Sequence, residues 1–114
     1  MKTDLDNWKS QIRKGYLDLC ILLLIETKKR IYGFELLDVL KKLELPVKEG
    51  TLYPLLSRMS ADGLLNTEWE TENSSGHPRK FYSLTKTGKS TVTEMLCEFD
   101  KLINVYHEIK KLEE

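Results

Sequence analysis

The stretch EGTLYPLLSRMSADGLL, residues 49–65, decides the fold that the sequence predicts. Its apolar residues recur at the i, i+3, i+4, i+7 spacing of one buried helix face: Leu52, Leu55, Leu56 and Met59. The opposite face carries polar side chains and a proline: Thr51, Tyr53, Pro54, Ser57 and Arg58. Because proline fits best within a first turn, Pro54 places the helix start near residues 48–51, and Gly63 is a left-handed cap at its end. The helix therefore has one face for a core and one for hydrogen bonding.

Two further helices are predicted before this stretch. Residues 7–28 keep helical spacing of apolar side chains and end in a basic cluster, which suits the C-terminal end of a helix dipole. A second helix is predicted from about Tyr32 to Leu43, and Pro46 is expected to stop it. The chain therefore begins with three helices.

The period of the sequence changes after Gly63. Residues 64–72 and 79–85 alternate in the manner of strands, and NSSGHP at 73–78 is typical of a turn, so a β-hairpin is predicted. Thr85 or Thr87 then caps a last helix that reaches about Leu112. Its apolar residues follow a heptad seam, widened by two neighbours: Val92, Met95, Leu96, Phe99, Leu102, Ile103, Tyr106 and Ile109.

Composition indicates an ordinary soluble domain. The chain has 114 residues, 40% of them hydrophobic and 32% charged, which suits one domain with a modest core. The longest apolar run covers residues 19–25 and is too short to span a membrane. The N-terminus does not resemble a signal peptide. We therefore expect a cytoplasmic protein with no membrane partner.

Neither a metal site nor a catalytic site is predicted. Cys20 and Cys97 both lie in apolar helical patterns and are expected to be reduced core thiols. The only histidines are His77 and His107, and no Cys/His spacing suits a metal. No nucleophile, phosphate-binding glycine loop or carboxylate pair is recognisable, so we expect no enzyme activity and no cofactor.

The net charge of zero conceals a local basic patch. Residues 76–89 hold four basic and no acidic side chains, whereas residues 64–75 hold three acidic and no basic ones. Because binding responds to local fields, a neutral total does not exclude a nucleic-acid partner.

Three helices followed by a hairpin is the element order of a winged helix-turn-helix. The predicted fold class is mainly α (α+β), with a winged helix-turn-helix at residues 1–86 and a C-terminal dimerisation helix at residues 87–114. The third helix of this architecture docks in the major groove of DNA, where hydroxyls and arginine bind base edges and phosphates. The candidate DNA contacts are Tyr32, Gly33, Lys48, Thr51, Tyr53, Ser57, Arg58, His77, Arg79 and Lys80.

Several of these residues have a second interpretation in the third helix. Its polar face as a whole could be a solvated surface. Tyr53 could pack under the wing, and Arg58 could pair with Asp62 at i+4 and add little to specificity.

The remaining candidates also have alternatives. Arg79 and Lys80 are adjacent on a strand and point to opposite faces, so one of them could lie against the protein. Tyr32 and Gly33 begin the second helix, where backbone N–H groups could hold a phosphate, although Gly33 could instead permit close packing. His77 could be a plain loop residue.

Three blocks of the sequence together resemble the PadR family of bacterial transcriptional regulators: YGFELLDVL, EGTLYPLLSRMSADGLL and GHPRKFYSLTKTG. The resemblance covers roughly residues 12–90. It departs from the family pattern at residues 59–61 and at Phe81. It implies a homodimeric winged-helix repressor that binds imperfect inverted repeats of double-stranded DNA. Some members of the family respond to phenolic acids or planar drugs.

The single long C-terminal helix is similar to that of the short PadR subfamily, in which it makes the dimer. In multidrug-sensing short members, an aromatic residue of this helix lines a pocket at the dimer centre, and Phe99 is the nearest match by position. We expect Trp8 and Phe99, with Ile103, to face each other across the dimer and hold an aromatic effector. Alternatively, these side chains only fill the dimer core.

The leading hypothesis is a homodimeric repressor that an aromatic, phenolic or drug-like effector releases from its operator. Two copies of the helix at residues 48–63 would enter successive major grooves, ~34 Å apart. The alternative is a winged-helix module for protein interaction or ligand binding that does not bind DNA.

Overall fold

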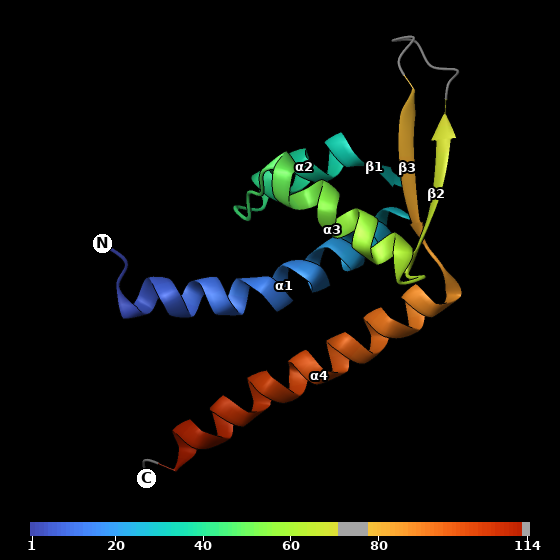
Figure 1. The fold of residues 1–114 in the computed structure, drawn as a ribbon. Helices are drawn as coiled ribbons and strands as arrows, with labels where there is room; N and C mark the ends of the chain where they lie inside the picture. The colour runs from blue at the N-terminus through green and yellow to red at the C-terminus, as the bar shows by residue number, and fades with distance from the viewer. Residues whose placement is uncertain (71–77, 113–114) are drawn as a thin grey trace.

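The computed structural model describes residues 1–70 and 78–112, so the predictions for His77 and for most of the hairpin tip lie outside it. In chain order the elements are α1 (Asp4–Lys28), β1 (Ile31–Tyr32), α2 (Gly33–Lys42), α3 (Glu49–Ala61), β2 (Leu65–Glu70), β3 (Arg79–Leu84) and α4 (Lys86–Lys111) (Figure 1). The mainly helical winged helix-turn-helix with a long last helix is thereby confirmed.

The first helix begins earlier than its apolar pattern predicts. Thr3 caps α1 in a capping box: the N–H of Asp6 donates to the Thr3 hydroxyl at 3.1 Å, and the N–H of Thr3 donates to the Asp6 carboxylate at 3.1 Å. This cap depends on polar side chains, which an apolar pattern does not include.

A third strand was not predicted. Ile31 pairs with Tyr82 and Tyr32 with Phe81, so β1 extends the hairpin to an antiparallel sheet of order β1-β3-β2. Tyr32 therefore ends a strand and is the N-cap of α2, rather than a helical residue. Two residues are too few to display a period of two, which is why the sequence pattern concealed this strand.

The second helix ends before the proline that was expected to stop it. It closes at Lys42, and Glu44 has a φ of 61° in the left-handed region. The chain has therefore already turned when it reaches Pro46.

The recognition-type helix α3 matches its prediction closely. Leu52, Leu56 and Met59 are buried, Leu55 is half-buried, and the helix begins at Glu49. Pro54 lies in the second turn rather than the first. Gly63 follows the helix with a φ of 79°, which confirms the left-handed cap.

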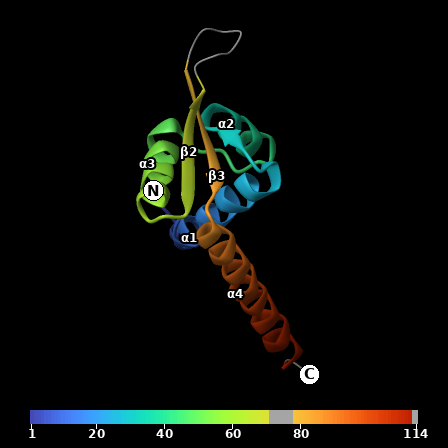
Figure 2. The same ribbon diagram turned by 90° about the vertical axis from the view of Figure 1, so that its right-hand side faces the viewer.

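The core joins all three helices of the winged part to the sheet. In Figure 2 the strands β2 and β3 lie between α3 and α2, with α1 below. One cluster of buried side chains connects these elements and ends at Val92 on α4: Leu17, Ile21, Leu22, Ile25, Ile31, Leu36, Leu40, Leu52, Leu56, Met59, Leu65, Tyr82, Leu84 and Val92. Cys20 is half-buried beside it, but Cys97 is exposed, so the prediction of two core thiols was wrong for Cys97.

The start of α4 is locked onto the loop that follows α3. Thr85 caps α4 by accepting the N–H of Gly88 at 2.9 Å, and its hydroxyl donates to the carbonyl of Gly63 at 2.6 Å. Its own N–H donates to the carbonyl of Leu64 at 3.0 Å. A Cβ at Gly88 would collide with that same carbonyl, so only glycine permits this approach.

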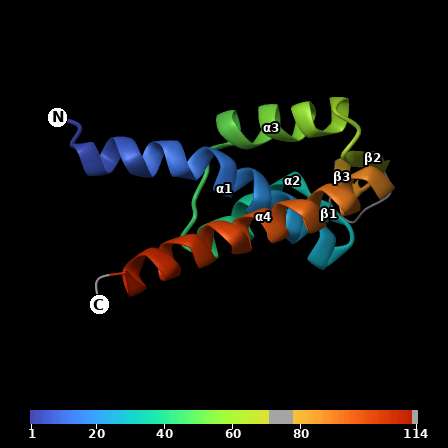
Figure 3. The same ribbon diagram turned by 90° about the horizontal axis from the view of Figure 1, so that it is seen from below.

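The far halves of α1 and α4 project away from this core (Figure 1). The Cα radius of gyration is 16.9 Å, whereas a compact domain of this length has about 13 Å. Seen from below, α1 runs between α3 and α4 (Figure 3). Among the described residues, no helix is both long and apolar enough to cross a membrane.

Candidate nucleic-acid interface

The side of α3 that faces away from the core is exposed, as predicted. Thr51, Tyr53, Pro54, Ser57 and Arg58 are all accessible to solvent. Lys48 is the exposed N-cap residue, and Tyr32 is the N-cap of α2. Within the described residues neither side chain caps its helix, and the first residue of α2, Gly33, is buried.

Tyr53 lies against the N-terminal end of α2. A Cβ added at the buried Gly33 would be 2.6 Å from the Tyr53 ring, so the two residues pack as closely as a missing side chain allows. Burial raises the pKa of the Tyr53 phenol, and the negative charge of Glu49 raises it further. This contact supports the close-packing interpretation of Gly33.

Arg58 pairs with a different acid from the one considered on sequence grounds. Its guanidinium donates to the Asp18 carboxylate of α1 at 2.8 Å, whereas Asp62 acts on it only as a weaker, more distant charge. The hydrogen bond to Asp18 raises the pKa of Arg58. Arg58 therefore joins α3 to α1, across 40 positions of sequence.

The two basic residues of the wing lie on opposite faces of the sheet, each on an aromatic platform. The Arg79 guanidinium is 4.9 Å from the centre of the Tyr32 ring. The Lys80 ammonium is 5.8 Å from the rings of both Trp69 and Tyr82. Such cation–π contacts orient a charge without neutralising it, so both cations keep their fields.

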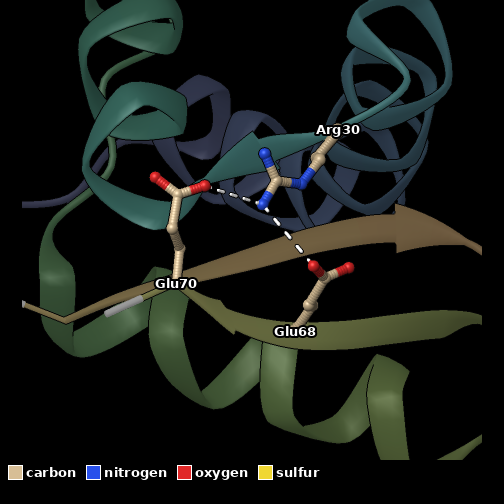
Figure 4. A network of polar contacts seen from close by, with 3 residues as sticks. All are labelled: Arg30, Glu68 and Glu70. Atoms are coloured by element: carbon tan, nitrogen blue, oxygen red, sulfur yellow. Dashed lines mark hydrogen bonds and ion pairs between the residues drawn. The ribbon is translucent and has the colours of Figure 1, made fainter. Parts of the chain in front are cut away.

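Arg30 organises the outer face of the wing and was not predicted. Its guanidinium lies 3.6 Å from the centre of the Phe81 ring, bonds Glu70 at 3.0 Å and reaches Glu68 at 3.8 Å (Figure 4). It thereby pairs with both acidic residues of β2 that the structure describes, beside the cations of β3, and offsets one of their two negative charges. No sequence signal could find it, because its position depends on the unpredicted strand β1.

A groove between α1 and α4 brings Trp8, Phe99 and Ile103 together. Its volume is about 1210 Å³, and four aromatic rings contribute to its wall: Trp8, Tyr16, Phe99 and Tyr106. Within one protomer the Phe99 ring packs on Tyr16, with 5.8 Å between ring centres. The expected effector residues thus line one groove of a single protomer.

The heptad seam of α4 divides into two halves. Val92 is fully buried in the protomer core, so its assignment to a dimer interface is corrected. Met95, Leu96, Phe99 and Ile103 are half-buried. Three seam residues stand 46–67% exposed: Leu102, Tyr106 and Ile109.

Metal binding finds no support in the part of the chain that the structure describes. There, no group of three or more His, Cys, Asp or Glu side chains could hold an ion.

Comparison with known proteins gives consistent matches. The family model described as the transcriptional regulator PadR-like family matches residues 21–94. A PadR-like transcription factor from Bacteroides fragilis is 44% identical, with a TM-score of 0.76, 91% of this chain covered and 99% of that one. A PadR family transcriptional regulator from Eggerthella lenta is 28% identical with a TM-score of 0.80, covering 92% and 90%. The transcriptional regulator Rv3488 of Mycobacterium tuberculosis is 38% identical over 64 residues, 56% of this chain and 58% of that protein.

The packing of Tyr53 on Gly33 can be tested by a pair of substitutions. Gly33→Ala is expected to destabilise the fold by about 1–3 kcal/mol, because the new methyl group overlaps the Tyr53 ring. In a Tyr53→Ala background the same change should cost nothing, since the overlap is gone. Urea unfolding followed by circular dichroism at one protein concentration measures both. An equal cost in both backgrounds would show that the ring is not the obstacle.

Proposed function

The chain belongs to the PadR-like family of transcriptional regulators, and we propose that it is a homodimeric repressor that binds an inverted-repeat operator in the cytoplasm, without enzymatic activity. One observation supports this best. The exposed polar face of α3 lies next to a wing whose cations, Arg79 and Lys80, contact aromatic rings. The neighbouring Glu70 is paired with Arg30.

The proposed DNA contacts fall into two kinds. Thr51 and Ser57 on α3 read base edges in the major groove, with Tyr53 at the α2 side of that surface. Lys48, Arg79 and Lys80 bind phosphates and supply affinity without sequence preference. Tyr32 at the N-terminal end of α2 and the first turn of α3 after Lys48 are further proposed contacts to phosphate, whereas the buried Gly33 serves the packing of Tyr53. His77 and Arg58 complete the proposed set.

Dimerisation is supported by apolar surface that one protomer leaves uncovered. Leu5, Trp8 and Ile12 on α1 are 53–58% exposed, and Leu102 and Ile109 on α4 are 67% and 58% exposed. Monomeric proteins rarely expose contiguous apolar patches of more than a few hundred Å². A second copy that brings its own α4 against this surface would bury both patches by symmetry.

The groove between α1 and α4 is the proposed effector site. Its volume of about 1210 Å³ exceeds the ~300–1,000 Å³ of pockets that hold one drug-sized molecule, which leaves room for both a ligand and side chains of the partner. A ligand that fits only one relative placement of α1 and α4 would shift the dimer toward that state, and so alter the spacing of the two α3 helices.

The charge of this groove favours a cationic effector over a phenolate. Its wall holds Glu94 and Glu98, and no lysine or arginine among the described residues. Glu98 pairs with Lys101 at 3.2 Å, which leaves Glu94 as the main counter-charge. Aromatic rings attract cations through their faces. A planar aromatic cation therefore suits the groove better than a planar aromatic acid.

The wing assignment predicts a loss of affinity that is independent of sequence. Arg79→Ala with Lys80→Ala should weaken binding to a library-selected duplex and to a scrambled one by the same factor. The association constant K should also become less dependent on salt. The plot of log K against log salt should be less steep by about two, because about one counterion fewer is released for each phosphate contact that is lost. Fluorescence anisotropy at several salt concentrations measures both quantities.

The charge-matched control is Lys110→Ala with Lys111→Ala at the far end of α4, which should leave the slope unchanged. Unaltered binding by the wing variant would refute the assignment. Complete absence of DNA binding by the unmodified protein at low salt would favour the alternative, a winged-helix module for protein interaction or ligand binding.

If α4 forms the proposed dimer, a charge introduced on the exposed half of its heptad seam is expected to separate the protomers. Leu102→Lys should sediment as a folded monomer at concentrations where the unmodified protein is a dimer, because burying an unpaired ammonium costs several kcal/mol or more. Asn104→Lys, on the opposite side of α4, is the control and should remain dimeric. A dimeric Leu102→Lys variant would place the interface elsewhere.

The effector site predicts selective quenching of Trp8 fluorescence by planar cations. Ethidium, titrated without DNA, should quench saturably, and the effect should disappear in Trp8→Phe, which retains Trp69. Glu94→Gln should weaken the binding of ethidium by about fivefold, as expected for the loss of a partly exposed charge pair. Ferulate, a planar anion, should bind more weakly than ethidium to the unmodified protein. The reverse order of affinities would contradict the proposed ligand class.

A further inference from the structure

The recognition helix α3 contains a single cation. Between Glu49 and Ala61 the only basic residue is Arg58. Its guanidinium donates to the carboxylate of Asp18 at 2.8 Å. A helix that is proposed to approach a polyanion thus presents its one positive charge already paired inside the protein.

The two partners differ in how firmly they are held. The Asp18 side chain is 26% exposed and belongs to α1, which is anchored in the core by Leu17, Ile21 and Leu22. The Arg58 side chain is 49% exposed. Arg58 also shares the α1-facing edge of α3 with Thr51, since both line a groove against Lys14 and Asp18. The carboxylate is therefore the fixed member and the guanidinium the one free to turn outward.

We propose that Asp18 is a positioning residue that limits the DNA affinity of α3, by holding Arg58 in an ion pair that a DNA phosphate has to displace. This inference rests on the proposed function, because it concerns the same DNA-binding surface.

Elementary electrostatics predicts that Asp18 lowers the affinity of α3 for DNA. An ion pair between half-exposed side chains is weak, so a phosphate can take Arg58 from Asp18. The exchange replaces one anionic partner by another, so Arg58 adds little net affinity. The released carboxylate is also repelled by the DNA backbone. Asp18→Asn keeps the shape of the side chain and removes both penalties.

The position of Asp18 on α1 links this pair to the groove proposed for the effector. Lys14 and Asp18 face α3, while Trp8, Ile12 and Tyr16 face α4, and Gly15 lines both grooves. Figure 3 shows α1 running between the two helices. One helix, α1, therefore connects the Asp18–Arg58 pair to the groove proposed for the effector.

The test compares Asp18→Asn, Arg58→Gln and the double variant as purified full-length protein on a library-selected duplex. Asp18→Asn should tighten binding by about threefold to tenfold and steepen the salt slope by about one, since one more cation becomes available to phosphate. Arg58→Gln alone should cost less than about twofold, yet in the double variant it should reduce the gain from Asp18→Asn to the smaller part that comes from removing the carboxylate's own repulsion of the DNA.

Glu108→Gln, which removes one acidic charge and an ion pair with Lys111 at the far end of α4, is the matched control and should bind like the unmodified protein. Melting curves by circular dichroism verify that every variant is folded. Equal tightening by Asp18→Asn with and without Arg58 would overturn the proposal, because Asp18 would then act through its own charge alone.

Unchanged or weaker binding by Asp18→Asn would also overturn it, while leaving the proposed function intact. Failure of the unmodified protein to bind any duplex at low salt would instead overturn the proposed function, and this inference with it.

Discussion

The carbonyl of Leu64 joins α3, which carries the proposed DNA-binding surface, to α4, which carries the proposed dimer surface. It accepts the N–H of Thr85 at 3.0 Å, and the missing side chain of Gly88 lets the first turn of α4 lie directly against it. The Thr85 hydroxyl adds a bond to Gly63, the residue that caps the end of α3. The direction of α4 is therefore fixed relative to α3 by backbone contacts, which have little freedom to adjust. In the proposed dimer, a change in how the two α4 helices meet is therefore expected to move the α3 helices as well.

The core supports the winged part and stops short of the far halves of the two long helices. Its last member on α4 is Val92, and beyond that residue α4 meets α1 only through half-buried side chains such as Met95 and Phe99. This explains both the large radius of gyration and the apolar groove between the helices. The groove is a consequence of the chain dividing its apolar residues between one core and one uncovered face. Because monomeric proteins rarely leave large apolar patches uncovered, such a face is a candidate surface for a partner.

Local signals predicted most of the fold, and contacts between distant segments were what the sequence concealed. The stripe of α3, the hairpin strands, the Thr85 cap and the Gly63 cap each depend on neighbours within a few residues. Strand β1 is too short to show a period, and the pairing of Arg58 with Asp18 joins positions 40 apart. Cys97 was misplaced because an apolar helix pattern does not say which part of a helix leaves the core.

In a chain with zero net charge, affinity for a polyanion depends on which cations are already engaged. The pairing of Arg30 favours DNA binding, since it offsets one of the two negative charges of Glu68 and Glu70 on the strand next to Arg79 and Lys80. Without it, two carboxylates would oppose the phosphates that the wing is proposed to bind. Pairing on α3 has the opposite consequence, because it occupies the helix's only cation. In the proposed interface, an ion pair therefore favours DNA binding by the wing and another disfavours DNA binding by α3, so we expect internal ion pairs, rather than total charge, to set the affinity.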